Sequence, residues 1–227
     1  KRQVMTPALA FDVALRERIA QNLGRHRVQS LRCEGRRRAA IAFTLINASA
    51  AADIGNIPHR DQHRRQAAFI LTTRAARMSS HAGPRAYPGG RVDKGESVQQ
   101  AALRELEEEV GLRLDAASVL GLLDDYATRS GYVITPVVVW GGSDVELVAN
   151  PAEVARIHRV PLQELMRGDA PLLDRIEESP QPVLRMPLGD DWFAAPSAAI
   201  AYQFREVALL GRSTRVAHFE QPRFAWQ

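Results

Sequence analysis

The feature that most constrains this chain is a run of glutamates inside a segment with the pattern of a helix. Residues 90–112 read GRVDKGESVQQAALRELEEEVGL. Ser97 suits an N-cap, and Gln100 follows at the spacing of a capping box. The intervening residues favour helix, and Gly111 is typical of a helix end. The apolar residues of the segment share one face at the spacing i, i+3 and i+7: Leu103, Leu106 and Val110.

The glutamates lie on the other side of this predicted helix. Glu105, Glu108 and Glu109 project within about a third of its circumference, at roughly 100° per residue. Like charges one turn apart destabilise a helix, yet the single basic neighbour is Arg104, which could hold Glu108 in a bidentate pair. Glu96, at the helix entrance, could also accept from Arg104. A divalent cation would make the crowding favourable, because Mg²⁺ prefers carboxylate oxygens together with substrate phosphate.

The spacing of these residues resembles the Nudix box. Gly90 is followed by Glu96, then by the run Arg104–Glu109, then by Gly111 and Leu112, which covers every defined position of the 23-residue pattern. The alternative interpretation is a merely acidic surface helix. The resemblance implies a fold, an α/β/α sandwich with a mixed β-sheet. It also implies a chemistry, the Mg²⁺- or Mn²⁺-dependent hydrolysis of a diphosphate linked to another moiety.

The resemblance further implies roles for individual residues. The implied metal ligands are three side chains and one backbone carbonyl: Glu105, Glu108, Glu109 and Gly90. Glu105 is the first candidate for the general base, and Arg104 and Glu108 complete the expected catalytic set. A carboxylate from a later loop, Asp144 or Glu146, is the alternative base.

Segments outside the box resemble one branch of the family, the coenzyme A pyrophosphatases. Leu71–Arg74, His81–Gly83 and Tyr87–Gly90 follow the upstream signature of that branch, and Thr128–Gly131 follows a later turn. Ser79 replaces an arginine of the branch, which removes a candidate contact to an anionic substrate. The expected substrate contacts are four basic side chains in or beside these segments: Arg74, His81, Arg85 and Arg129. For His81, a structural role in the loop is the alternative.

This resemblance implies a hydrolase that cleaves coenzyme A or an acyl-coenzyme A to 3′,5′-ADP and (acyl-)4′-phosphopantetheine. A pyrophosphatase of ADP-ribose or of another nucleoside diphosphate derivative is the alternative. A Nudix-fold binding module without catalysis is a third hypothesis. Such a copy would be expected to lose a glutamate of the box, and all of them remain.

The charge and the arginine content of the chain indicate which kind of ligand it binds. The 227 residues carry a formal net charge of +4, nearly all of the positive charge being arginine, whose planar fork suits phosphate. The charge is dispersed, so we expect a small-molecule nucleotide and no nucleic acid. Cys33 is the only cysteine and allows no internal disulfide. Without a long apolar run or a signal peptide, we expect a cytoplasmic protein that does not bind membranes.

Hydrophobic patterning around the box predicts alternating strands and helices. Strands are expected at 39–46, 67–73, 118–126, 132–140, 144–148 and 183–188, and helices at 6–23, from 151, at 161–167 and at 197–210. Residues 47–65 read as a loop, and Pro136 predicts an edge strand or a bulge. We expect residues 1–35 to form an N-terminal helical extension packed on the core. Residues 36–227 would form the Nudix domain, whose aromatic tail docks on the core or on the second copy of a homodimer.

Overall fold

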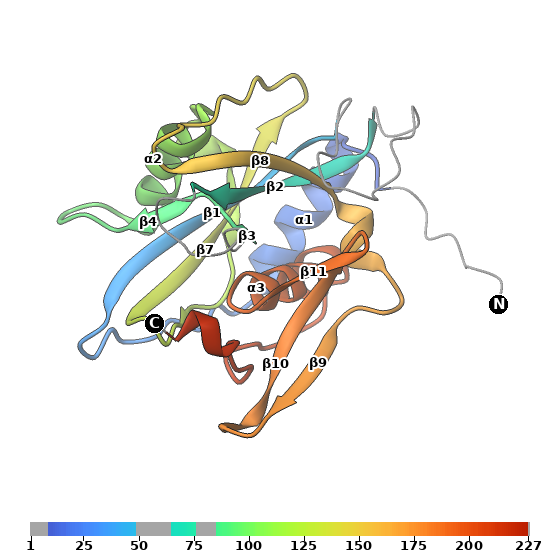
Figure 1. Cartoon of the computed structure of the whole chain (residues 1–227). Helices are drawn as coiled ribbons and strands as arrows, with labels where there is room; N and C mark the ends of the chain where they lie inside the picture. The colour runs from blue at the N-terminus through green and yellow to red at the C-terminus, as the bar shows by residue number, and fades with distance from the viewer. Residues whose placement is uncertain (1–8, 49–64, 76–84, 227) are drawn as a thin grey trace.

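The computed structural model describes residues 9–48, 65–75 and 85–226 and has a layered α/β arrangement (Figure 1). Within these residues the main sheet has eight strands, in the order β3-β2-β1-β7-β5, with β4 paired to β1, β6 to β7 and β8 to β2. β1 and β7 run parallel, whereas β1 and β2 are antiparallel. The predicted mixed sheet is therefore confirmed.

The bounds of the elements are as follows. The main sheet contains β1 (Arg37–Asn47), β2 (Ala67–Arg74), β3 (Arg85–Ala86), β4 (Gly89–Arg91), β5 (Val119–Leu122), β6 (Tyr126–Ala127), β7 (Tyr132–Gly142) and β8 (Val154–Pro161). A second sheet contains β9 (Leu172–Ile176), β10 (Ser179–Leu188) and β11 (Asp191–Ala194). The α-helices are α1 (Val13–Arg25), α2 (Val98–Val110) and α3 (Ser197–Phe204), the last continued by a π-helix at Arg205–Leu209. The helix predicted at 161–167 is a 3₁₀ helix at Leu162–Met166.

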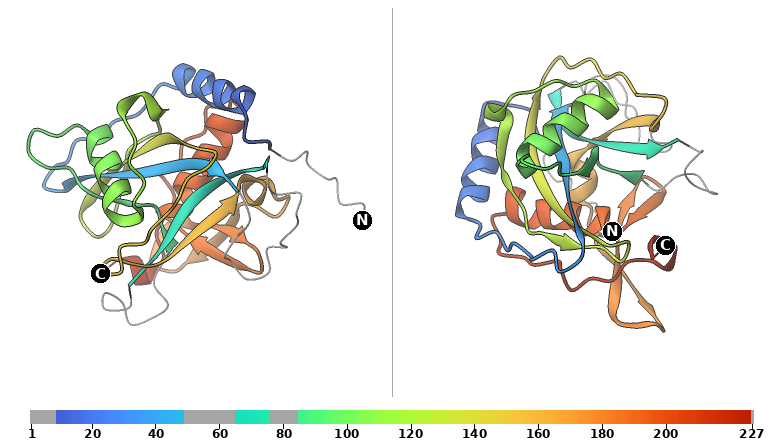
Figure 2. Two further views of the ribbon diagram at one scale, coloured as in Figure 1. Left: turned by 90° about the horizontal axis from the view of Figure 1, so that it is seen from above. Right: turned by 90° about the vertical axis from the view of Figure 1, so that its left-hand side faces the viewer.

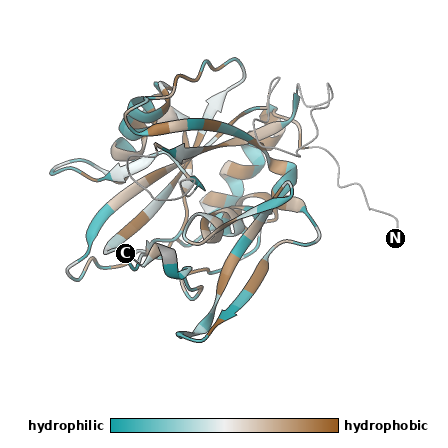
Figure 3. Cartoon of the chain, viewed as in Figure 1, coloured by the Kyte–Doolittle hydropathy of each residue, from teal (hydrophilic) through white to brown (hydrophobic). Residues whose placement is uncertain are grey.

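Helices cover both faces of the main sheet, which confirms the predicted α/β/α sandwich (Figure 2). α2 packs on one face, where Leu106 and Val110 meet Ala40 and Val137. α1 and α3 pack on the other face, in a cluster that contains Phe43. β1 is apolar on both faces because it lies between these two layers, and Figure 3 shows the apolar stretches along the inner strands.

The structure corrects several predicted element boundaries. The first helix begins at Val13, after an N-cap at Asp12, and continues through Gly24 to Arg25. The predicted strand 118–126 is two short strands, β5 and β6, separated at Asp124 and Asp125. Pro136 lies in a central strand rather than at an edge. It is tolerated because it falls where β7 passes from β5 to β6, so its missing N–H leaves the ladder intact.

The region after β7 was predicted wrongly. Residues 144–148 do not form a strand, and the helix expected from Pro151 is a turn followed by β8. The Asn150 side chain accepts from Ala152 N at 3.1 Å, which is a local turn contact rather than a helix cap. The β-branched residues of 154–160 then pair along β2. The hydrogen bonds of this strand pair come from a distant part of the chain, so the local sequence does not indicate them.

The last quarter of the chain closes the far face of the sheet. The strand predicted at 183–188 is the apolar half of β10, and the helix predicted at 197–210 is α3 with its π-helical end. Phe204 stacks on Phe43 with ring centroids 4.1 Å apart. Phe219 of the tail packs against the core. None of the described helices combines the length and apolar character needed to cross a bilayer.

Candidate active site

α2 is fixed at both ends by the residues that the sequence indicated. Ser97 Oγ accepts from Gln100 N at 3.2 Å, and Gln100 Oε1 accepts from Ser97 N at 2.9 Å, so the capping box is complete. Gly111 ends the helix in the left-handed conformation, with φ of 71°, which a residue with a Cβ adopts only at a cost. The register of the glutamates along α2 is thereby defined.

The glycines of β4 lie directly against the carboxylates of α2. Gly89 N donates to Glu109 Oε1 at 3.2 Å. A Cβ at Gly90 would stand 2.3 Å from Glu105 Oε1, so only glycine permits this approach. Gly90 therefore lies against Glu105, and its neighbour Gly89 lies against Glu109.

Arg104 joins the entrance of α2 to its carboxylates. Its guanidinium donates to both oxygens of Glu96, at 3.0 and 3.2 Å. It also donates to Glu105 Oε1 at 2.7 Å and to Glu108 Oε2 at 3.1 Å. The bidentate partner is thus Glu96, and not Glu108 as predicted, because Glu96 presents both oxygens to the edge of the guanidinium while Glu108 remains half-exposed.

Burial perturbs the carboxylates at the base of the site. Burial raises the pKa of Glu109 to about 7, against the hydrogen bond from Gly89 N and the charge of Arg74. Burial also raises the pKa of Glu105, against its hydrogen bond to Arg104. Glu109 is only 7% exposed. Within the described ranges it has no ion-pair partner, and a carboxylate so buried is unfavourable when ionised.

The residues fit a hard divalent cation, with one rearrangement. Among the described residues, no three His, Cys, Asp or Glu side chains are gathered closely enough to hold a metal ion as they stand. The cause is visible at Arg104, which engages Glu105 and Glu108. Buried carboxylate oxygens are the donors that Mg²⁺ and Mn²⁺ prefer, and a cation would compensate the buried charge of Glu109.

A later carboxylate approaches the site from the turn before β8. The charge of Glu153 raises the pKa of both Glu105 and Glu109. Its backbone carbonyl accepts from Ala75 N at 2.9 Å, directly after β2, and Asn150 N donates to Glu109 O at 2.9 Å. The carboxylates predicted from a later loop were Asp144 and Glu146. Glu153 was not predicted here, because its segment has the pattern of a helix start. The pairing of β8 with β2 brings it here.

The predicted substrate-contact residues divide into separate groups. Arg74, at the end of β2, lies near the carboxylates, since its charge lowers the pKa of Glu109. Arg85 on β3 is instead engaged by β11, through Asp191 Oδ2 at 2.9 Å and Trp192 O at 3.3 Å. His81 lies outside the described residues.

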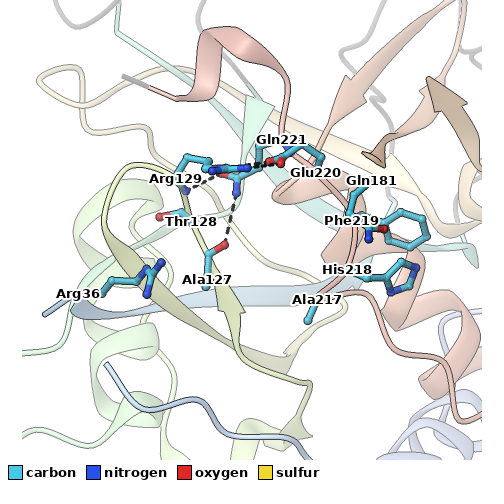
Figure 4. A pocket seen from close by; sticks show the side chains of 10 residues that line it. All are labelled: Arg36, Ala127, Thr128, Arg129, Gln181, Ala217, His218, Phe219, Glu220 and Gln221. Carbon is cyan, nitrogen blue, oxygen red and sulfur yellow. Dashed lines mark hydrogen bonds and ion pairs between the residues drawn. The ribbon is translucent and has the colours of Figure 1, made fainter. Parts of the chain in front are cut away.

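Arg129 lies in a pocket of about 260 Å³ that contains no residue of the box (Figure 4). Its guanidinium pairs with Glu220 and lies over the ring of Trp226, 4.9 Å from the centroid. Other lining residues include Arg36 and His218. The tail therefore builds this pocket around Arg129, and the structure does not bring Arg129 to the carboxylates of α2.

Comparison with known proteins agrees with this architecture. A family model described as the NUDIX domain matches residues 52–185. A protein of Photorhabdus laumondii named "Uncharacterized Nudix hydrolase NudL" is 45% identical over 99 residues, which are 43% of this chain and 53% of that protein. A protein of the same name from Cronobacter sakazakii is 40% identical over 105 residues, 46% of this chain and 55% of that protein. The chain thus spans about half the length of the curated relatives it matches.

Solved structures with similar folds carry low sequence identity. A MutT/nudix family protein from Enterococcus faecalis is 17% identical, with a TM-score of 0.48 over 75% of this chain and 61% of that one. The NUDIX domain of Shewanella oneidensis NrtR, crystallised with ADP ribose, is 20% identical, with a TM-score of 0.44 over 76% of this chain and 88% of that one. Because the family model covers more than half of the residues, from 52 to 185, the chain belongs to the Nudix family.

Proposed function

We propose that this chain is a divalent-metal-dependent hydrolase of nucleoside diphosphate derivatives. The observation that carries the proposal is the pair of carboxylates, the half-buried Glu105 and the buried Glu109, which lie against the glycines of β4. The buried Glu109 has no ion-pair partner among the described residues, which is unfavourable for an ionised carboxylate. Arg104 and Arg74 lie beside the pair, and guanidinium groups suit phosphate oxygens.

The residues of the site divide the work as follows. Glu105, Glu108, Glu109 and the Gly90 carbonyl would hold Mg²⁺ or Mn²⁺. When bound, the ion would neutralise the diphosphate and make water a better nucleophile. Glu105 would accept the proton of the attacking water at a carboxylate oxygen, once Arg104 releases Glu105 and keeps its bidentate pair with Glu96. Arg74 would hold the phosphate oxygens from the opposite side.

The favoured substrate is coenzyme A or an acyl-coenzyme A. Water would add to one phosphorus and break the P–O–P bond, releasing 3′,5′-ADP and (acyl-)4′-phosphopantetheine, and protons would pass to solvent. Support comes from the segments 71–74, 87–90 and 128–131, which resemble that branch of the family. ADP-ribose and other nucleoside diphosphate derivatives remain the alternative substrates, because the carboxylate site would interact only with the diphosphate, which all of these compounds share.

A panel of diphosphate compounds tests the proposal. The purified chain is incubated with Mg²⁺ or Mn²⁺ and coenzyme A, acetyl-coenzyme A, ADP-ribose, NADH or diadenosine tetraphosphate, and the products are separated by chromatography. We expect coenzyme A and its acyl derivative to be cleaved fastest, and Glu109→Gln to abolish cleavage. Cleavage of ADP-ribose with coenzyme A untouched would reject the substrate and keep the activity. A chain that binds these compounds without cleaving any would be a binding module.

A further inference from the structure

A cluster of positive charge lies beside the glycines of β4 and is not used by the site described above. Arg91 follows Gly90 directly, and its Nε donates to Tyr132 Oη at 3.4 Å. Arg37 lies over the ring of the same tyrosine, 5.0 Å from the centroid. Both guanidinium groups belong to exposed residues.

The backbone holds this cluster in a fixed relation to the carboxylates. Arg37 and Tyr132 are register partners on β1 and β7, and Arg91 is the register partner of Ala39 on β1. Arg91 O accepts from Arg104 Nη2 at 2.9 Å. Arg91 is therefore hydrogen-bonded through its backbone to Arg104, the arginine that also contacts Glu105.

The charge of Arg74 connects the two sites. Arg74 lowers the pKa of Glu109 on one side. Arg91, Arg37 and Arg74 together lower the pKa of Tyr132 on the other side, the hydrogen bond from Arg91 being the largest cause. The charge of Arg74 thus acts both on Glu109 and on Tyr132.

Among the residues that the structure describes, no carboxylate compensates the positive charge of the cluster. Two other arginines beside the core are neutralised by carboxylates: Arg38 by Asp125 and Arg215 by Asp124. Within the described ranges, neither Arg37 nor Arg91 has a carboxylate partner. Two guanidinium groups oriented by one tyrosine, with no carboxylate partner in the described part of the chain, form a site that an external anion would complete.

We propose that Arg37, Arg91 and Tyr132 form a subsite for a phosphomonoester that the substrate carries outside its scissile diphosphate. This inference rests on the proposed function, because it extends the same substrate. The diphosphate is already matched by the metal ligands and Arg74, so the further cations call for further negative charge. A phosphomonoester supplies about −1.5 to −2 charges and three acceptor oxygens, which suit two guanidinium forks. The substrate class is then a nucleoside 5′-diphosphate derivative with an additional phosphate on its ribose.

Matched pairs of substrates that differ by one phosphate test the subsite. Values of kcat/KM are measured for coenzyme A and dephospho-coenzyme A, and for ADP-ribose 2′-phosphate and ADP-ribose. We expect the wild-type chain to prefer a phosphorylated member. Arg37→Ala and Arg91→Ala should each lower kcat/KM for that member about 10- to 100-fold and leave its partner within about twofold. Tyr132→Phe keeps the ring below Arg37 and should have a smaller effect.

Arg175→Ala is the matched control. Arg175 is an exposed arginine of β9, which lies in the second sheet at the opposite end of the molecule from α2 (Figure 1). Its substitution should change neither the rates nor the preference. An equal loss for both members of a pair in Arg91→Ala, or no preference in the wild type, would overturn the subsite while the proposed hydrolase stands.

Calorimetric titration without metal gives a readout that does not depend on turnover. We expect 3′,5′-ADP to bind more tightly than 5′-AMP, and Arg91→Ala to remove the difference. Equal affinities in the wild-type chain would overturn the subsite. If the wild type cleaves none of the diphosphates but keeps this arginine-dependent preference, the proposed function fails and the subsite stands.

Discussion

Some single residues of this chain lower the stability of the fold when they are ionised, and Glu109 is the clearest example. It is almost fully buried, it accepts from Gly89 N, and burial raises its pKa to about 7. A group whose pKa is raised in the fold stabilises the fold in its protonated form. That contribution is complete below the unfolded pKa of 4.5 and is lost as the pH rises through 7.

Replacement of this carboxylate should therefore stabilise the metal-free protein. We expect Glu109→Gln to raise the free energy of unfolding in EDTA at pH 8 by at most about 3 kcal/mol, because the variant buries no charge. The gain should shrink between pH 7 and pH 4.5. Urea unfolding at several pH values measures it, and a variant less stable than the wild type at pH 8 would contradict the argument.

Glu153 makes a second prediction at this scale. Its charge acts on both Glu105 and Glu109, so it should strengthen their attraction for a cation. We expect Glu153→Gln to raise the Mg²⁺ concentration that gives half-maximal activity about tenfold. Glu146→Gln serves as the matched control and should leave it unchanged. A larger change in Glu146→Gln than in Glu153→Gln would show that Glu146, and not Glu153, is the later carboxylate that strengthens metal binding.

At the scale of elements, the break between β5 and β6 places two aspartates where they join distant segments. Asp124 accepts from Arg215 at 2.7 and 2.8 Å, from Gln203 at 2.6 Å and from Gln29 N at 2.8 Å. It also lies 3.0 Å from His26 Nε2. Burial alone would raise its pKa, but these hydrogen bonds outweigh burial and lower it. One side chain thus ties the end of α1 and the segments around α3 to the sheet.

Loss of this junction should destabilise the whole fold. We expect Asp124→Asn to lower the free energy of unfolding by about 3–5 kcal/mol, because Arg215 and the segment after α1 lose their anion. The contribution is present above the unfolded pKa of 3.8 and falls away as the pH drops below it. Chemical denaturation measures it. Asp190→Asn, at an exposed turn residue, is the control and should change little.

At the scale of the whole molecule, the proposed N-terminal extension is built into the same core as the sheet. Leu15, Ile19 and Leu23 of α1 are buried in the cluster that contains Phe43 and Phe204. α1 and α3 thus cover one face of the sheet while α2 carries the glutamates on the other. The rigidity of the carboxylate site therefore depends on a layer that contributes no residue to it.

Removal of α1 from the chain tests whether the fold depends on this helix. We expect a chain lacking residues 1–27 to be insoluble or molten, because the sheet face under α1 would be exposed. Ile19→Ala should cost about 2–5 kcal/mol of stability. Val13, which is 68% exposed on the same helix, should tolerate alanine. Thermal unfolding compares them, and a cooperative, active truncated chain would show that residues 1–35 are a dispensable addition.

The sequence alone determined the parts of this protein that depend on neighbours along the chain. The capping box of α2, its glycine end, the glutamate face and the buried strands follow from spacings of a few residues, which local sterics and hydrophobic periodicity fix. The resemblance of that local pattern to the Nudix box then predicted the α/β/α sandwich with a mixed β-sheet.

Only the tertiary structure decided which distant groups share an environment. The ladder between β2 and β8 made residues 154–161 a strand and brought Glu153 to the carboxylates. The tail enclosed Arg129 in a separate pocket. The parallel pairing of β1 with β7 set Arg37 over Tyr132. Such contacts join residues far apart in the chain, so their energies depend on packing and burial rather than on any local pattern of residues.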